Sequence, residues 1–145
     1  MFKHILLPTD GSDLSLRAVD IGIGLAASFG AKVLAYHAME PFATLPYYSD
    51  AMAFPEDVYL NQAQEHAAYY LQQVRERAKA AHVECDAIYE FEHRPYEGIV
   101  RAAHDRHCDL IVMGSHGRSG LDKLLLGSQA NKLLLAADVP VLICH

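Results

Sequence analysis

Short apolar runs alternate with longer amphipathic segments along all 145 residues of the chain. Runs that are apolar on both sides are typical of strands buried in a parallel sheet. Such runs occupy residues 4–7, 31–38, 87–91, 109–113 and 140–144. Apolar residues at three- and four-residue spacing between them predict helices. The order βαβαβαβαβ, without an internal repeat or a linker, therefore predicts a single α/β domain that spans the chain, residues 1–145.

Capping and charge signals place the ends of the helices. Ser12 or Asp13 can cap the first helix, and Gly30 can close it. The acidic pair at 56–57 suits the start of a long second helix, and Pro95 suits the start of a third. One face of the long helix is predicted to be buried, through Leu60, Ala63, Ala67, Leu71, Val74 and Ala78.

The segment 39–55 interrupts this regular pattern. It holds three prolines and four aromatic residues, which favours a long loop over a helix or strand. We expect the loop to pack on the domain or to act as a lid, with Tyr47 and Tyr48 as the side chains that would cover a ligand.

The alternation of strands and helices predicts a doubly wound, five-stranded parallel sheet with helices on both faces and the strand order 3-2-1-4-5. In such a sheet the ligand crevice lies beyond the carboxyl ends of the strands, where the order reverses. Two turns that contain glycine and serine, 8–12 and 114–117, follow the first and fourth strands. This strand order would place them side by side.

Composition narrows the function classes. Twelve Lys and Arg residues against eighteen Asp and Glu residues give a net charge of −6, which disfavours nucleic acid as the main ligand. No apolar run reaches the roughly 18 residues of a membrane span, and the N-terminus lacks the features of a signal peptide. Cys85, Cys108 and Cys144 are far apart and form no CxxC, which disfavours disulfides and a zinc ribbon. We therefore expect a cytoplasmic protein with reduced thiols.

The residues that carry chemistry follow the fourth strand. Gly114, Gly117, Gly127 and Ser128 form the pattern G-x2-G-x9-G-S. The glycines let backbone amides approach a ligand, and the last two residues open a helix whose unpaired amides attract phosphate. The Ser128 hydroxyl can bind a phosphate oxygen or cap the helix, and these roles compete. Arg118 can add positive charge nearby.

This pattern resembles the nucleotide motif of the universal stress protein family, in the branch that binds ATP. The opening PTDGS at 8–12 and the closing PVLICH at 140–145 are also similar to that family, so the resemblance covers essentially the whole chain. It implies an adenine nucleotide alpha hydrolase-like fold. One position departs from the family pattern, because His93 stands where the family often has glycine, two residues before a proline.

The resemblance also implies a set of site residues, in which Asp10 would accept a hydrogen bond from a ribose hydroxyl or from the adenine amino group. The full set of expected nucleotide-binding residues is Pro8, Thr9, Asp10, Ala38, Met113, Gly114, His116, Gly117, Arg118, Gly127, Ser128 and Gln129.

Three other patterns are interpreted as structural or as secondary. Residues 22–27 match G-x-G-x-x-A, but they lie inside a helical pattern rather than at a strand-to-helix turn, so close helix packing explains them better than dinucleotide binding. The cluster of His104, His107, Cys108 and Asp109 is interpreted as a solvated helix end rather than as a metal site. His116 lies in the glycine loop, but no partner that would orient it for proton transfer is evident.

The expected function is that of a cytoplasmic ATP-binding regulatory or stress-response protein. Mg²⁺ is expected to accompany the phosphates, although the sequence offers no dedicated acidic pair. Hydrolysis should be slow or absent, because no evident base positions a water and no P-loop is present. Two alternatives stay open: a nucleotide hydrolase or nucleotidyl-transfer enzyme on the same fold, and an interaction module whose nucleotide is only structural.

A homodimer is the expected assembly. The last strand is an apolar edge that would otherwise be a pairing hazard, and by resemblance it pairs with a second copy. The residues expected at this contact are Val139, Val141, Leu142 and Ile143.

Overall fold

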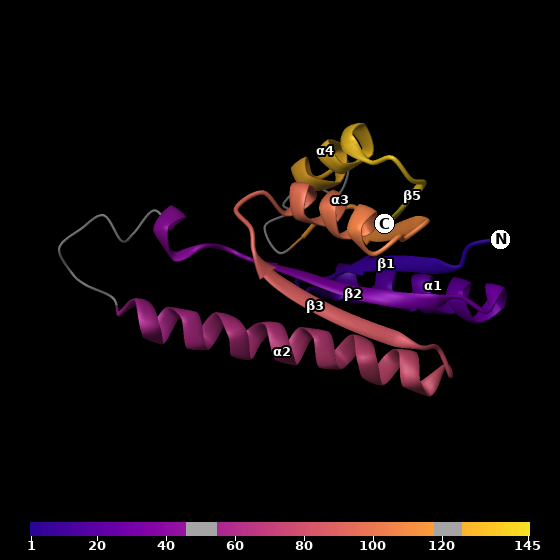
Figure 1. The fold of residues 1–145 in the computed structure, drawn as a ribbon, viewed down its shortest axis with the longest axis horizontal. Helices are drawn as coiled ribbons and strands as arrows, with labels where there is room; N and C mark the ends of the chain where they lie inside the picture. Colours follow the sequence, from indigo (N-terminus) through magenta and orange to yellow (C-terminus); the bar gives the residue numbers. More distant parts are fainter. Residues whose placement is uncertain (46–54, 118–125) are drawn as a thin grey trace.

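The chain folds into one parallel sheet with helices on both faces (Figure 1). The structure, a computed structural model, describes residues 1–45, 55–117 and 126–145. In chain order the elements are β1 (His4–Pro8), α1 (Asp13–Phe29), β2 (Lys32–Met39), the 3-10 turn η1 (Phe42–Thr44), α2 (Glu56–Ala80), β3 (Cys85–Phe91), α3 (Pro95–Asp105), β4 (Leu110–Gly114), α4 (Ser128–Ala136) and β5 (Val141–Cys144).

The predicted strand order is confirmed. The sheet runs β3-β2-β1-β4-β5 and all its pairs are parallel. β3 begins two residues earlier than the pattern predicts, because Cys85 already pairs with Val33, and β2 is shifted by one residue to Lys32–Met39, where Met39 pairs with Phe91. The order therefore reverses between β1 and β4, as the crossover argument requires.

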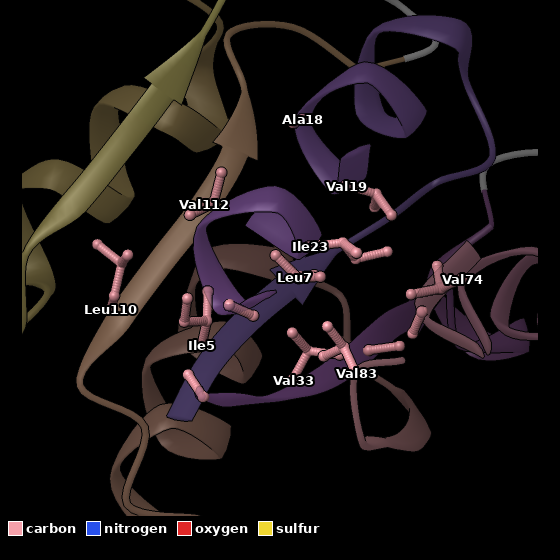
Figure 2. Packing of buried hydrophobic residues seen from close by; sticks show 14 of the residues in the cluster. Ile5, Leu7, Ala18, Val19, Ile23, Val33, Val74, Val83, Leu110 and Val112 are labelled. Carbon is pink, nitrogen blue, oxygen red and sulfur yellow. The ribbon is translucent and has the colours of Figure 1, made fainter. Parts of the chain in front are cut away.

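Successive residues of the central strands point to opposite faces, and each face has its own core. Ile5 and Leu7 pack beneath α1 and α2 together with Val33 and Val112 (Figure 2). Leu6, between them in the sequence, packs with the residues of the α3 and α4 face. This two-sided burial explains why the strands read as continuous apolar runs.

The ends of α1 agree with the predicted capping signals. The Ser12 hydroxyl accepts a hydrogen bond from the amide of Ser15 at 3.2 Å, and Gly30 ends the helix in the left-handed conformation with φ of 65°. Inside the helix, a Cβ on Gly22 would collide with the Leu7 side chain of β1. The first glycine of the G-x-G-x-x-A pattern therefore serves close packing of the helix, whereas a Cβ on Gly24 would meet nothing within 4 Å.

The N-terminal half of α2 extends past the carboxyl ends of β2 and β3 (Figure 1). Of its predicted apolar face, Ala67, Leu71, Val74 and Ala78 are buried against the sheet, whereas residues 60 and 63 are only half-buried. The difference arises because no strand lies beneath the first turns of the helix. In the preceding segment Phe42–Thr44 forms η1 rather than loop, and Tyr47 and Tyr48 lie outside the described residues.

In the part of the chain that the structure describes, no helix is both long enough and apolar enough to span a bilayer.

Candidate functional site

A cavity of about 1030 Å³ opens at the carboxyl ends of β1, β2 and β4. The N-terminal half of α2 forms one wall, and the first residues of α3 and α4 form the opposite wall (Figure 1). Its volume is at the upper end of the range of about 300–1,000 Å³ that is common for small-molecule sites. The cavity lies where the sequence predicts the ligand crevice.

Eleven of the twelve expected binding residues line this cavity. They are Pro8, Thr9, Asp10, Ala38, Met113, Gly114, His116, Gly117, Gly127, Ser128 and Gln129. The twelfth, Arg118, lies outside the described residues. Residues from four separate parts of the chain are thus brought to one hollow.

The turn between β1 and α1, residues 9–12, is held by its own side chains. The Thr9 amide donates to the Tyr36 carbonyl oxygen at 2.9 Å, which continues the sheet pairing by one residue. The Thr9 hydroxyl accepts from the Gly11 amide at 3.1 Å, and Asp10 Oδ1 accepts from the Ser12 amide at 3.0 Å. This β1–α1 turn therefore presents Asp10 in a defined orientation.

The β1–α1 turn and the glycine loop after β4 meet at the sheet reversal. A Cβ on Gly117 would lie 2.5 Å from Asp10 Oδ2, and a Cβ on Gly114 would lie 3.2 Å from Leu14 of α1. Side chains at positions 114 and 117 would crowd this junction. The two glycines thus allow the two turns to approach each other, as their sequence pattern suggests.

Gly127 joins the glycine loop to α4. Its amide donates to the Ser115 carbonyl oxygen at 2.9 Å, and a Cβ there would lie 2.7 Å from the same oxygen. The Ser115 amide in turn donates to the Cys144 carbonyl oxygen at 2.8 Å. These bonds fix the start of α4 at the cavity, where the amides of its first turn have no acceptor within the helix. Such an end favours an anion.

The predicted competition for the Ser128 hydroxyl does not arise. Gly127 occupies the N-cap position of α4, and Ser128 is the first helical residue. Because glycine has no side chain to cap the helix, the first-turn amides are left for a ligand. His116, beside them, has its Nδ1 3.0 Å from the Ser115 hydroxyl.

Gln129 has a structural partner besides its place in the cavity wall. Its Oε1 accepts a hydrogen bond from the Tyr96 amide at 3.0 Å, in the first turn of α3. The Lys132 ammonium lies 5.7 Å from the centre of the Tyr96 ring. Gln129 therefore ties the first turns of α3 and α4 together.

Sequence reasoning missed the α2 wall. Tyr59, Gln62, Ala63, His66 and Tyr70 follow one another at helical spacing and all line the cavity. This row lies beside the buried face of α2, so the helical periodicity alone could have located it. Its contact with the site could not be predicted, because it depends on how far α2 extends past the sheet.

The second missed group lies at the end of β2. His37, Met39 and Glu40 line the cavity together with the predicted Ala38. Glu40 Oε1 is 2.6 Å from Nδ1 of His93, and the Glu40 carbonyl oxygen accepts a hydrogen bond from the Tyr59 hydroxyl. The position that departs from the family pattern is therefore in contact with the rim of the cavity.

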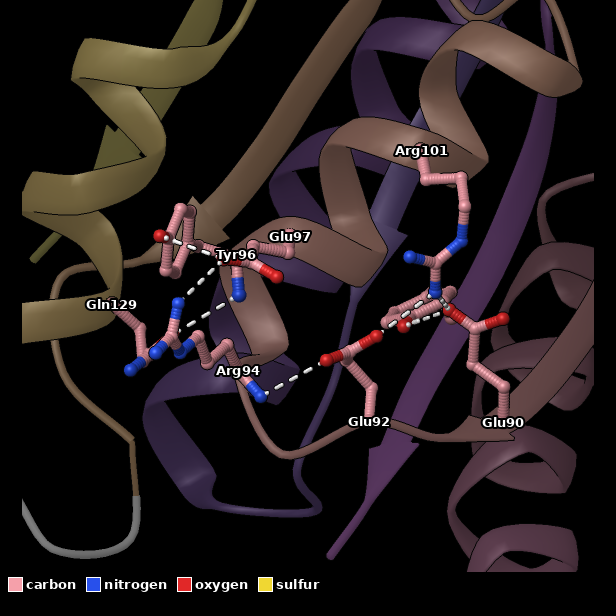
Figure 3. A network of polar contacts seen from close by, with 8 residues as sticks. Glu90, Glu92, Arg94, Tyr96, Glu97, Arg101 and Gln129 are labelled. Carbon is pink, nitrogen blue, oxygen red and sulfur yellow. Dashed lines mark hydrogen bonds and ion pairs between the residues drawn. The ribbon is translucent and has the colours of Figure 1, made fainter.

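A polar network supports the wall formed by β2 (Figure 3). The Tyr36 hydroxyl donates to Glu90 Oε1 at 2.7 Å, and Arg101 donates to Glu90 at 2.6 Å and to Glu92 at 3.0 Å. Burial, and then the hydrogen bond to Glu90, raise the pKa of Tyr36 above its usual value. The amide of Arg94 and then the Arg101 side chain lower the pKa of Glu92. Tyr36 therefore stays neutral and Glu92 stays charged at neutral pH.

Within residues 1–45, 55–117 and 126–145, no three His, Cys, Asp or Glu side chains gather closely enough to hold a metal ion. His104 lies 3.2 Å from Asp105 at the exposed end of α3. His107 has a positive φ of 55° just after that helix.

Comparison with known proteins agrees with the fold. The model of the universal stress protein family matches residues 1–145. A universal stress protein of Thermus aquaticus is 38% identical over 144 residues, covering 99% of this chain and 98% of the relative. One from Methanocaldococcus jannaschii is 34% identical over 145 residues, covering 99% and 82%. A solved universal stress protein in complex with cAMP has a TM-score of 0.75 and 29% identity, covering 99% and 97%.

Proposed function

The chain belongs to the universal stress protein family, and we propose that its cavity binds an adenine nucleotide, with ATP as the first candidate. The observation that carries the proposal is the start of α4, where Gly127 and the amides of Ser128, Gln129 and Ala130 form what we call the glycine cradle. There a Cβ on Gly127 would displace the Ser115 carbonyl, and the first-turn amides border the cavity. A relative with the same fold holds cAMP, which supports an adenine nucleotide as the ligand class.

The residues that line the cavity fall into two groups, one suited to the phosphates and one suited to the ribose and base. The amides of Ser128, Gln129 and Ala130, with Gly114 and Gly117 leaving room, suit the phosphates. Asp10 and the end of β2 at Ala38 suit the ribose and base. A Mg²⁺ ion bound with ATP would take most of its ligands from phosphate oxygens and water, because the described walls hold no acidic cluster.

The proposed role is regulatory rather than catalytic. His116 is a titratable residue whose ring lies beside Gly127 at the start of α4, and its Nδ1 is already 3.0 Å from the Ser115 hydroxyl. Turnover is therefore expected to stay well below about 1 s⁻¹, the lower end of common enzyme rates. The three free cysteines fit the reducing conditions of the cytoplasm, which is the proposed location.

A homodimer through β5 is part of the proposal. β5 pairs with β4 on one side only and ends the sheet order. Its apolar side chains, with Leu142 39% exposed, form an edge that a second copy would cover.

Titration calorimetry with ATP, ADP, AMP and cAMP tests the ligand. Gly127→Ala should weaken binding by at least about tenfold, because the new Cβ must displace a backbone carbonyl that shapes the cradle. Gly24→Ala is the matched control, since a Cβ there meets nothing within 4 Å. Equal affinities for the wild type and both variants would refute the assigned cradle. Absence of binding by the wild type would refute the nucleotide function.

A further inference from the structure

Tyr70 of α2 lies directly against the β1–α1 turn. Gly11 has φ of +78°, and a Cβ there would fall within the Tyr70 ring, against its Cδ1, Cε1 and Cζ atoms. Only a glycine combines this backbone conformation with room for the ring. The α2 wall of the cavity therefore fits closely against the turn that carries Asp10.

The Tyr70 ring is flanked by Tyr69, which is exposed, and by two histidines that also line the cavity. His37 meets it edge-on, with ring centres 5.2 Å apart and an interplanar angle of 71°. His66, one helical turn before Tyr70, lies 6.2 Å from it, ring centre to ring centre. Aromatic pairs in such arrangements restrict each other's orientation. The ring thus has a fixed place over Gly11.

His37 contacts the other end of the β1–α1 turn, at Thr9. Its Nδ1 lies 2.8 Å from the Thr9 carbonyl oxygen, and because a carbonyl only accepts, Nδ1 is the donor. Tyr70 and His37 therefore contact the turn on both sides of Asp10. The carboxylate of Asp10 is further fixed through Oδ1, which accepts from the Ser12 amide.

We propose that Tyr70, supported by His37, is a positioning residue that sets the Asp10 carboxylate to accept a hydrogen bond from a ribose hydroxyl of the bound nucleotide. The inference rests on the proposed function and adds a specificity determinant from α2. It also explains the glycine at position 11, which is not part of the cavity wall but lies against the Tyr70 ring.

The test compares the affinity for ATP with that for 2′,3′-dideoxyATP, which lacks both ribose hydroxyls. The wild type should prefer ATP by about tenfold, the range of one hydrogen bond to a charged group. Tyr70→Leu should lose this preference while it keeps the affinity for the dideoxy nucleotide, and Asp10→Asn should show the same pattern. Tyr70→Phe should behave as the wild type, because the contact uses ring carbons.

Tyr69→Leu is the matched control. Tyr69 is the preceding residue on the same helix, is 62% exposed and is not part of the cavity wall. Its ring lies 6.0 Å from that of Tyr70, ring centre to ring centre, but the atoms nearest to a Cβ on Gly11 all belong to Tyr70. The Tyr69→Leu variant should retain the preference for ATP. A merely structural role of Tyr70 would lower both affinities together with the melting temperature, and that result would overturn the inference. Gly11→Ala, which pushes on the ring from the other side, provides a second variant with the same expected loss of preference.

The two proposals fail in distinguishable ways. If the wild type binds ATP but Tyr70→Leu keeps its preference, or if the wild type shows no preference, the positioning role is wrong and nucleotide binding stands. If the wild type binds neither nucleotide, the proposed function is wrong and the inference falls with it.

Discussion

His4 is a buried titratable residue at the start of β1, at the opposite end of the sheet from the cavity. Its Nδ1 donates to the Arg106 carbonyl oxygen at 3.0 Å, and among the described residues its Nε2 has no hydrogen-bond partner. Burial, the largest effect, lowers the pKa of His4 below the usual 6.5. The folded protein therefore keeps this imidazole neutral at a pH where the unfolded chain protonates it.

This difference predicts a loss of stability in mild acid. Above about pH 6.5 both states are neutral at His4, so the residue adds no pH dependence. Below it, the unfolded state binds the extra proton, and the free energy of unfolding should fall by at most about 1.4 kcal/mol per pH unit from this group. Urea unfolding at pH 7.5 and 5.5 measures the effect.

His4→Gln should show a smaller fall between the two pH values than the wild type, whatever its stability at pH 7.5. His104→Gln, at the exposed end of α3, is the control and should retain the full dependence. An unchanged pH dependence in His4→Gln would show that the buried imidazole is not the group responsible.

Single residues also show what the sequence could and could not predict about the site. The spacing of Gly114, Gly117 and Gly127 pointed to positions where the chain approaches itself closely, because a close backbone contact needs glycine whatever surrounds it. The helix signal at Gly127-Ser128 located the α4 N-terminus, but it did not tell which of the two residues is the cap. The contact of Tyr70 with Gly11 could not be predicted from the sequence, because it forms only when α2 packs against the β1–α1 turn.

At the scale of one element, α1 contains two glycines with opposite surroundings. A Cβ on Gly22 would overlap the Leu7 side chain of β1 and come within 3.4 Å of Val112 of β4. A Cβ on Gly24 would meet nothing within 4 Å. One glycine is needed for packing against the sheet, and the other only weakens the helix.

Alanine at the two positions should therefore have opposite effects. Gly22→Ala should lower the free energy of unfolding by about 1–3 kcal/mol, the usual cost of overpacking a core. Gly24→Ala should raise it by about 0.5–1 kcal/mol through helix propensity. Chemical denaturation of both variants checks this, and destabilisation of similar size at both positions would contradict the packing explanation.

The elements themselves were largely predictable, and their lengths were not. Two-sided apolar runs identified all five strands, and capping residues identified both ends of α1. β3 begins two residues earlier than predicted because Cys85 and Asp86 find backbone partners on β2, which a single strand's sequence does not reveal. α2 was predicted as a helix with one buried face, but the way its first turns leave the sheet is a property of the packed domain.

At the scale of the whole molecule, the sheet has two edges of different character. β3 forms one edge and β5 the other. β5 is short and its neighbour α4 carries Leu135, which is 84% exposed. β3 also exposes apolar side chains, Tyr89 at 46% and Phe91 at 37%, so what favours β5 for the proposed dimer is the larger exposure of Leu135 on the helix that precedes it.

Introducing a lysine at each edge of the sheet tests whether β5 or β3 forms the dimer interface. Leu142→Lys introduces a lysine that a two-fold axis would bring near its own copy, so the like charges oppose each other and the apolar contact is lost. Tyr89→Lys, at a position of β3 that is 46% exposed, is the matched control on the other edge. Light scattering at micromolar concentration should show a dimer for the wild type and Tyr89→Lys and a monomer for Leu142→Lys. A monomeric wild type would refute the dimer, and a dimer lost only in Tyr89→Lys would move the interface to β3.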